Sequence, residues 1–197
     1  FGEFGCFSLH PLKNLNVWGD GGFVLTNTKK NYEKMMLLRN HGLISRNVNK
    51  IFGYNSRLDT VQACVANHLL KKINIITNTR RKNSEYLDKH LKQINILKLK
   101  NRHKKYYEVF HLYEFRVGKM SLRKQLVDHL RNKGIDAKIH YPVPMHLQPA
   151  AKKFKYKKGD FPMTELIANS TVSLPVHEFI KKKHLNYIIK TIKEFFK

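Results

Sequence analysis

A single lysine, Lys13, lies in a turn-rich segment whose residues could carry out nucleophilic chemistry. The segment FSLHPLKNLNVWGDGG covers residues 7–22. A lysine in water is protonated and unreactive, so a reactive lysine must be partly desolvated and held still. Pro11 restricts the backbone two residues earlier. Apolar neighbours that could exclude water surround the lysine in the sequence: Leu12, Leu15, Val17 and Trp18.

Ser8 lies five residues before Lys13 and adds a second chemical group to the same loop. Its hydroxyl, together with backbone N–H groups, could donate to a phosphate oxygen. An amine for an aldehyde and donors for a phosphate are what pyridoxal 5'-phosphate requires. The spacing alone leaves a second interpretation open, in which Lys13 is a solvated lysine in a surface turn.

Short strands are expected on both sides of this loop, at residues 1–9 and 20–27. Gly21 and Gly22 precede the second strand. Glycines at this position indicate that the backbone is pressed close to a neighbouring atom. The two strands would then hold the loop from both ends.

Helices are expected to follow. Residues 29–41 predict a helix that ends at Gly42, with three side chains inward: Tyr32, Met35 and Met36. A helix from Leu58 places an apolar stripe on one face: Leu58, Val61, Cys64, Val65 and Leu69. The next helix, to about residue 93, carries TRRKNSE (79–85) on a solvated face. The two cysteines, Cys6 and Cys64, are expected to be small apolar residues that fill space in the core.

The second half of the chain alternates strands and helices. Residues 106–117 alternate apolar and polar side chains and predict a half-buried strand. A helix follows from Ser121, as its cap, to Gly134. Residues 135–142 predict a strand, and the chain ends in a helix from about residue 181. This order is typical of a small α/β unit, with a boundary expected near residues 95–105.

The composition is strongly basic. Lys and Arg number 38 against 14 Asp and Glu, a net charge of +24 with His neutral. Because the lysines are scattered over every segment, they favour a solvated surface over a nucleic-acid interface; a basic nucleic-acid-binding module stays as the alternative. Two cysteines suggest neither a disulfide framework nor a metal site. A reduced, cytoplasmic compartment is therefore expected. No long apolar run is present, so we expect no membrane segment.

Several strings of residues occur together in one order along nearly the whole chain. CFSLHPLKNLNVWGDGGFVLTN (6–27) and LLRNHG (37–42) come first. GYNSRLDTVQACVA (53–66), IHYPVPMHLQPA (139–150) and SLPVH (173–177) follow. In this order they resemble the DegT/StrS family of sugar aminotransferases, although Leu9 replaces the family's usual aromatic residue. The resemblance implies the C-terminal part of an α/β, fold-type I pyridoxal-phosphate-dependent transferase: the end of its large domain at residues 1–100 and a small α/β domain at 101–197.

The resemblance also implies roles for individual residues. Lys13 would form the imine with the cofactor and move protons, and Ser8 would bind the cofactor phosphate. Asn55 would reach the phosphate of the neighbouring subunit's cofactor, with Arg57 binding anionic groups at the same interface. On residue type alone, helix capping and a surface ion pair are the favoured explanation of Asn55 and Arg57. His146 and Tyr141 would lie at the substrate end of the pocket; a structural hydrogen bond for His146 and a strand position for Tyr141 are the alternatives.

The implied activity is transfer of an amino group, from an amino acid such as glutamate, to a nucleotide-linked keto-deoxysugar in amino-sugar or surface-polysaccharide biosynthesis. Family members act as homodimers with shared sites. A sugar dehydratase of the same family is the alternative, but those members replace the lysine with histidine. A complete member is about twice as long, so the isolated 197 residues are expected to be inactive.

Overall fold

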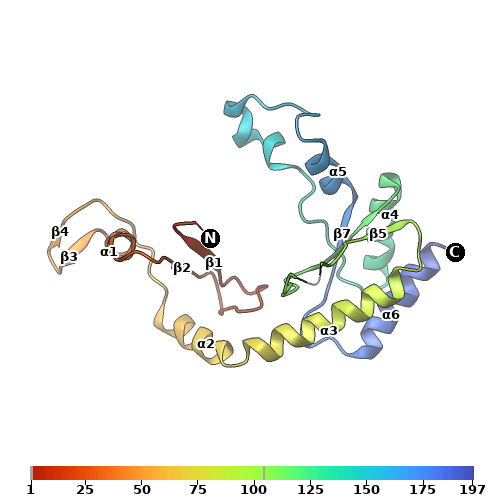
Figure 1. Cartoon of the computed structure of the whole chain (residues 1–197), viewed down its shortest axis with the longest axis horizontal. Helices are drawn as coiled ribbons and strands as arrows, with labels where there is room; N and C mark the ends of the chain where they lie inside the picture. Colours follow the sequence, from red (N-terminus) through yellow and green to blue (C-terminus); the bar gives the residue numbers. More distant parts are fainter. Residues whose placement is uncertain (1, 104) are drawn as a thin grey trace. The chain divides into compact units, whose positions relative to one another are not determined.

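The computed structural model describes residues 2–103 and 105–197 (Figure 1). Its residues form two compact units, the first ending at Asn74 and the second covering Ile75–Lys197. The two units are described separately below. The domain division after residue 100 is a different boundary and stays a prediction.

The first unit consists of two small strand pairs and two helices. Strand β1 (Gly5–Ser8) pairs antiparallel with β2 (Gly22–Leu25), and β3 (Leu43–Ser45) pairs antiparallel with β4 (Val48–Asn49). Helix α1 covers Lys29–Leu38 and helix α2 covers Thr60–Leu70. The strands expected on both sides of the Lys13 loop are therefore present, as one antiparallel ribbon.

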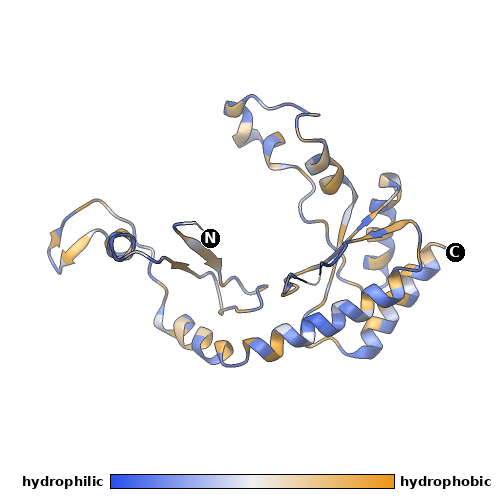
Figure 2. Ribbon diagram, in the orientation of Figure 1, coloured by the Kyte–Doolittle hydropathy of each residue, from blue (hydrophilic) through white to orange (hydrophobic). Residues whose placement is uncertain are grey.

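The helices of the first unit bury none of their described residues. Tyr32 and Met36 of α1 are exposed, and Val61 of α2 is 67% exposed. Both cysteines are exposed thiols as well. Figure 2 shows hydrophobic residues on α2 and β3. The predicted inward orientation is therefore wrong for Tyr32, Met36, Val61 and Cys64, while Met35, Val65 and Leu69 are half-buried. A helix face is buried only where a second layer packs against it.

The second unit contains a three-stranded antiparallel sheet in the order β5-β6-β7. Its strands are β5 (Leu97–Leu99), β6 (Tyr113–Val117) and β7 (Thr171–Leu174). Its helices are α3 (Ile73–Leu91, which begins at the end of the first unit), α4 (Met120–Asn132), α5 (Pro162–Ser170) and α6 (Lys182–Phe195), with 3-10 turns η1 (Met145–Leu147) and η2 (Pro149–Phe154).

The core of the second unit lies between the sheet and its helices. Phe115, opposite Leu99 and Val172, sits at the middle of the sheet. Tyr113, Phe115 and Val117 are buried, which confirms the predicted alternation over residues 113–117, whereas Val109, expected on the same face, is exposed. The amphipathic last helix is also confirmed, because α6 buries one stripe of residues at helical spacing: Leu185, Ile188, Ile189 and Ile192.

Three predicted features of this unit are wrong in detail. The strand expected at 106–117 begins only at Tyr113, because Phe110 adopts a left-handed backbone (φ 50°) that interrupts extended structure. The strand expected at 135–142 is a single bridge between Lys138 and Ser173. Ser121 lies inside α4, whose N-cap is Lys119.

A buried ion pair corrects the interpretation of residues 79–85 as a solvated face. The Arg80 side chain is 6% exposed, and its Nη2 lies 3.0 Å from Glu178 Oε2. Its Nη1 donates to the Phe110 carbonyl at 3.4 Å. A buried guanidinium needs such partners, because an unpaired buried charge is strongly destabilising.

We expect two Ile→Ala substitutions to separate buried from exposed positions. Ile192 on α6 is fully buried and Ile75 on α3 is 69% exposed. Ile192→Ala should lower the free energy of unfolding by about 2–5 kcal/mol, since it removes core contacts and leaves a cavity. Ile75→Ala should change it by less than about 0.5 kcal/mol. Urea unfolding followed by circular dichroism measures both, and equal losses would contradict this core.

Candidate cofactor and substrate site

The β1–β2 ribbon closes the loop that contains Lys13. Ser8 at the end of β1 lies opposite Gly22 at the start of β2. Beyond this pair, the Leu9 N–H donates to the Gly21 carbonyl at 2.8 Å, and the Val17 N–H donates to the Leu9 carbonyl at 2.9 Å. Leu9 and Val17 are buried. The loop is therefore anchored at its base by backbone hydrogen bonds and two apolar side chains.

Lys13 is held within this loop on both sides of its backbone. Its N–H donates to the His10 carbonyl at 2.8 Å, and its carbonyl accepts from Asn16 Nδ2 at 3.0 Å. The residue is half-buried. The backbone of Lys13 is therefore held in place, and the residue is partly removed from solvent. The water-excluding neighbours are only partly confirmed, because Leu12 and Trp18 are exposed.

The glycines after Lys13 approach other atoms closely, as predicted. A Cβ on Gly22 would lie 2.8 Å from the Phe7 carbonyl oxygen. A Cβ on Gly21 would lie 2.9 Å from Leu58 Cδ1 and 3.0 Å from Val17 Cγ2. Larger residues would push the loop away from Leu58, just ahead of α2. These glycines thus let the loop pack tightly on the rest of its unit.

Ser8 has a hydroxyl that can still donate. Its Oγ accepts from the His10 N–H at 3.2 Å, and the residue is exposed. A serine hydroxyl carries one hydrogen besides its acceptor lone pairs. The local bond therefore orients the oxygen and leaves the hydrogen for an anionic oxygen.

Asn55 and Arg57 contact the end of α1. Arg57 Nη1 donates to Asn40 Oδ1 at 2.7 Å, and Asn55 pairs with Asn40 as an isolated bridge. The Tyr54 N–H donates to the Leu38 carbonyl at 2.7 Å. Both predicted residues are exposed. The structure thus brings Asn55 and Arg57 together at the end of α1.

Tyr141 and His146 belong to the second unit and have different surroundings. Tyr141 is 75% exposed, with its ring 5.5 Å from the His140 ring. The His146 side chain is 7% exposed, and its Nε2 lies 3.1 Å from Glu165 Oε1. The structural hydrogen bond that was the alternative for His146 is therefore present, and its partner is a carboxylate.

Glu165 was not among the predicted site residues. It lies in the first turn of α5, and its Oε1 accepts the Gly159 N–H at 2.7 Å. This bond, with a further contribution from His146, lowers the pKa of Glu165 below its ordinary value. A glutamate three residues after a proline at a helix start is a recognisable signal of such a position.

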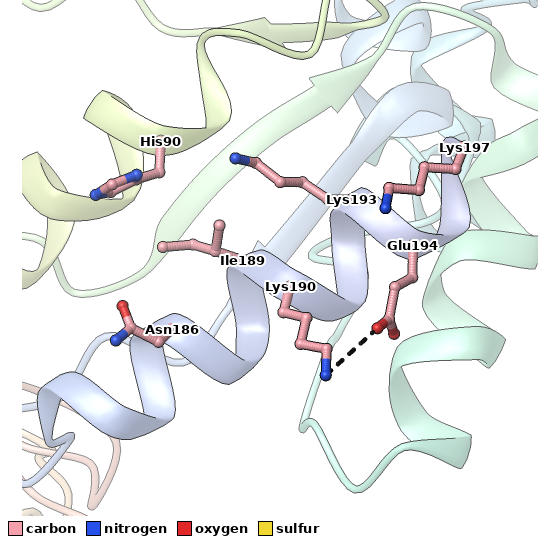
Figure 3. Close-up of a pocket in the computed structure, with 7 residues that line it drawn as sticks. All are labelled: His90, Asn186, Ile189, Lys190, Lys193, Glu194 and Lys197. Atoms are coloured by element: carbon pink, nitrogen blue, oxygen red, sulfur yellow. Dashed lines mark ion pairs between the residues drawn. The ribbon is translucent and has the colours of Figure 1, made fainter.

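A surface hollow of about 340 Å³ lies between the ends of α3 and α6, and none of the six predicted residues lines it. Figure 3 shows Lys190 paired with Glu194 there, with Nζ and Oε1 3.8 Å apart. Further basic side chains line it: His90, Lys193 and Lys197. Such a cluster is expected on the surface of a chain with this many lysines.

Two searches restricted to the described residues gave negative results. Within residues 2–103 and 105–197, no three His, Cys, Asp or Glu side chains gather so that they could hold a metal ion. In the same part of the chain, every helix is too short or too polar to cross a membrane.

We expect the Glu165 carboxylate to stabilise the fold only while it is ionised. Because its pKa is lowered in the folded state, its contribution is present above the ordinary glutamate value and is lost as the pH falls through the folded value. The stability difference between the wild type and Glu165→Gln should therefore be largest at neutral pH and shrink on acidification below about pH 4.5. Urea unfolding at a series of pH values measures it; a constant difference would contradict a stabilising role of the ionised Glu165 carboxylate.

Comparison with known proteins identifies the chain. The model of the DegT/DnrJ/EryC1/StrS aminotransferase family matches residues 1–193. The dTDP-3-amino-3,4,6-trideoxy-alpha-D-glucose transaminase of Streptomyces venezuelae is 34% identical over 192 residues, which are 96% of this chain and 49% of the relative. A pleiotropic regulatory protein of Geobacillus stearothermophilus is 33% identical over 201 residues, which cover 100% of this chain and 53% of that relative.

Solved structures agree. The crystal structure of DesV from S. venezuelae superposes with a TM-score of 0.92 at 31% identity, covering 98% of this chain and 52% of DesV. The chain thus spans about half the length of the relatives it matches. The family resemblance and the α/β fold class predicted from the sequence are confirmed. This chain belongs to the DegT/DnrJ/EryC1/StrS aminotransferase family.

Proposed function

We propose that this chain contributes the cofactor lysine and part of the substrate site of a pyridoxal-phosphate-dependent sugar aminotransferase. The donor is an amino acid, glutamate by preference, and the acceptor is a nucleotide-linked keto-deoxysugar. The observation that carries the proposal is the Lys13 loop, in which a half-buried lysine lies on a backbone that is hydrogen-bonded on both sides. The S. venezuelae transaminase, which is named for a dTDP-linked amino sugar, supports the substrate class.

The residues of the Lys13 loop fit this cofactor. Lys13 supplies the amine, and Ser8 supplies a hydroxyl whose hydrogen is still available. The close approach of Gly21 to Leu58 leaves no space for a side chain that would displace the loop. An amine for the aldehyde and a donor for the phosphate are thus present on one short loop.

Each residue has a defined role in this proposal. When bound, pyridoxal 5'-phosphate supplies an aldehyde that bonds to amines and a ring that takes up electrons. Lys13 Nζ would hold the cofactor and, once released, would accept a proton from the substrate carbon and return one. Ser8 Oγ would donate to the phosphate. His146 and Tyr141 would bind and orient the sugar.

Asn55 and Arg57 are proposed to act across a homodimer. They are exposed and are held against the end of α1, so their side chains are accessible to a second subunit. Asn55 would donate to the phosphate in the neighbouring subunit, and Arg57 would bind anionic groups beside it.

We further propose that the enzyme is cytoplasmic and serves surface-polysaccharide or other amino-sugar biosynthesis. Its scattered positive charges would form a solvated surface. The 197 residues alone are proposed to be inactive, since relatives of this family are about twice as long. Salt-dependent binding of DNA or RNA would favour the basic binding module instead.

We expect Lys13 to be the residue that bonds to the cofactor. The protein is incubated with pyridoxal 5'-phosphate, reduced with borohydride, digested and examined by mass spectrometry. The peptide with Lys13 should carry the label. Lys13→Ala should abolish the label, because the substitution removes the amine that bonds to the cofactor aldehyde. Lys34→Ala, at an exposed lysine of α1, is the control and should keep full labelling. Equal labelling of many lysines, unchanged in Lys13→Ala, would contradict the assignment.

We expect Lys13 and Asn55 to serve the same site from different subunits. Lys13→Ala and Asn55→Ala should each be nearly inactive in the transaminase assay of the protein that contains this chain. After the two variants are mixed through unfolding and refolding, heterodimers should hold one intact site, and activity should return to about a quarter of wild type. If both residues served a site within one subunit, mixing would restore nothing.

A further inference from the structure

The pair formed by His146 and Glu165 is almost shielded from solvent. The side chains are 7% and 13% exposed, and His146 Nε2 lies 3.1 Å from Glu165 Oε1. His146 lies in η1 and Glu165 lies on α5, nineteen residues later in the chain. A carboxylate from one element therefore contacts an imidazole from another.

Two hydrogen bonds converge on one oxygen of this carboxylate. Oε1 accepts the Gly159 N–H at 2.7 Å as well as facing His146 Nε2. Hydrogen bonds from N–H groups favour the ionised carboxylate, in keeping with the lowered pKa of Glu165. An ionised carboxylate can only accept. The hydrogen between the two side chains must therefore be on His146 Nε2.

The other ring nitrogen is then determined. In a neutral imidazole, one nitrogen carries the hydrogen and the other has a lone pair that accepts. With the hydrogen on Nε2, the lone pair is on Nδ1. Among the described residues, the His146 ring makes its hydrogen bond, to Glu165, through Nε2. Nδ1 is thus the nitrogen left for a ligand.

Aromatic packing holds the plane of the ring. The Phe161 ring lies 4.8 Å from the His146 ring, and the Tyr156 ring packs edge-on against Phe161 at 5.0 Å. The turn that carries His146 is closed by the Leu147 N–H, which donates to the Pro144 carbonyl at 2.9 Å. The plane of the imidazole ring, and with it the direction of the Nδ1 lone pair, is therefore constrained.

We propose that Glu165 is a positioning residue that fixes His146 as its Nε2–H tautomer, so that Nδ1 accepts a hydrogen bond from a hydroxyl group of the sugar substrate. The assignment of the ligand rests on the proposed function. The tautomer follows from the contacts within this chain. An acceptor nitrogen selects a hydroxyl-bearing sugar, because a substrate without that hydroxyl leaves Nδ1 unpaired.

Nuclear magnetic resonance tests the tautomer directly. Long-range ¹H–¹⁵N spectra of the ¹⁵N-labelled chain are recorded well above the ordinary imidazole pKa of about 6.5. His146 should show a protonated Nε2 and an unprotonated Nδ1. Glu165→Gln keeps an oxygen that can accept and should keep this pattern. Glu165→Ala should give a mixture of tautomers.

A matched control separates positioning from general loss of structure. Glu194→Ala removes a partly exposed carboxylate on α6 that pairs with Lys190, and it should leave the His146 signals unchanged. Amide spectra of the variants report whether the second unit is folded. An Nδ1–H tautomer in the wild type, or an unchanged Nε2–H tautomer in a folded Glu165→Ala, would overturn the proposal.

Kinetics of the active protein then test the ligand. Glu165→Ala should raise KM for the nucleotide sugar at least tenfold while changing kcat less, and Glu165→Gln should restore most of the loss. A fixed tautomer with unchanged KM would overturn the sugar contact and leave the positioning role standing. If no transaminase activity is found at all, the proposed function fails, and the spectra still decide the tautomer.

Discussion

The register of one short strand pair determines the geometry of the candidate cofactor site. With Ser8 opposite Gly22, the hydroxyl lies at the end of one strand and the lysine loop begins directly after it. A slip of one residue would turn every side chain of the strand to the other face, and Ser8 would no longer share a face with its present neighbours. Gly22 permits this register because its missing side chain leaves room for the Phe7 carbonyl. The stacked rings of Phe7 and Phe23, 4.8 Å apart, support the same pairing.

Local patterns in the sequence were sufficient to predict the elements that carry their own core. The apolar stripe of α6 and the alternation of β6 are each visible in a short run of neighbouring residues. The apolar side chains of both patterns are buried as expected. The Lys13 loop was also recognisable, because its lysine, serine and glycines lie within fifteen residues of one another. The family followed from the order of several motifs along the chain, and no single motif would have sufficed.

Other features depend on partners that are distant in the sequence. Arg80 was assigned to a solvated face, since its neighbours are charged, yet it is buried against a glutamate 98 residues later. The partnership of His146 with Glu165 required the fold of the segment between them. The apolar faces of α1 and α2 were identified correctly as apolar, but periodicity does not reveal whether another layer covers them. The roles assigned to all six candidate site residues stay predictions, because their ligands lie outside this chain.

The β1–β2 ribbon has a consequence for the cooperativity of the site. Its two strands of four residues pair only with each other among the described residues, and an isolated two-stranded ribbon is marginally stable in water. Anything that binds the folded ribbon in preference to its frayed state shifts this equilibrium toward order by mass action. Ordering of the lysine loop is thereby linked thermodynamically to whatever covers the ribbon, so that the affinity of this loop for a ligand is set partly by contacts that never touch the ligand.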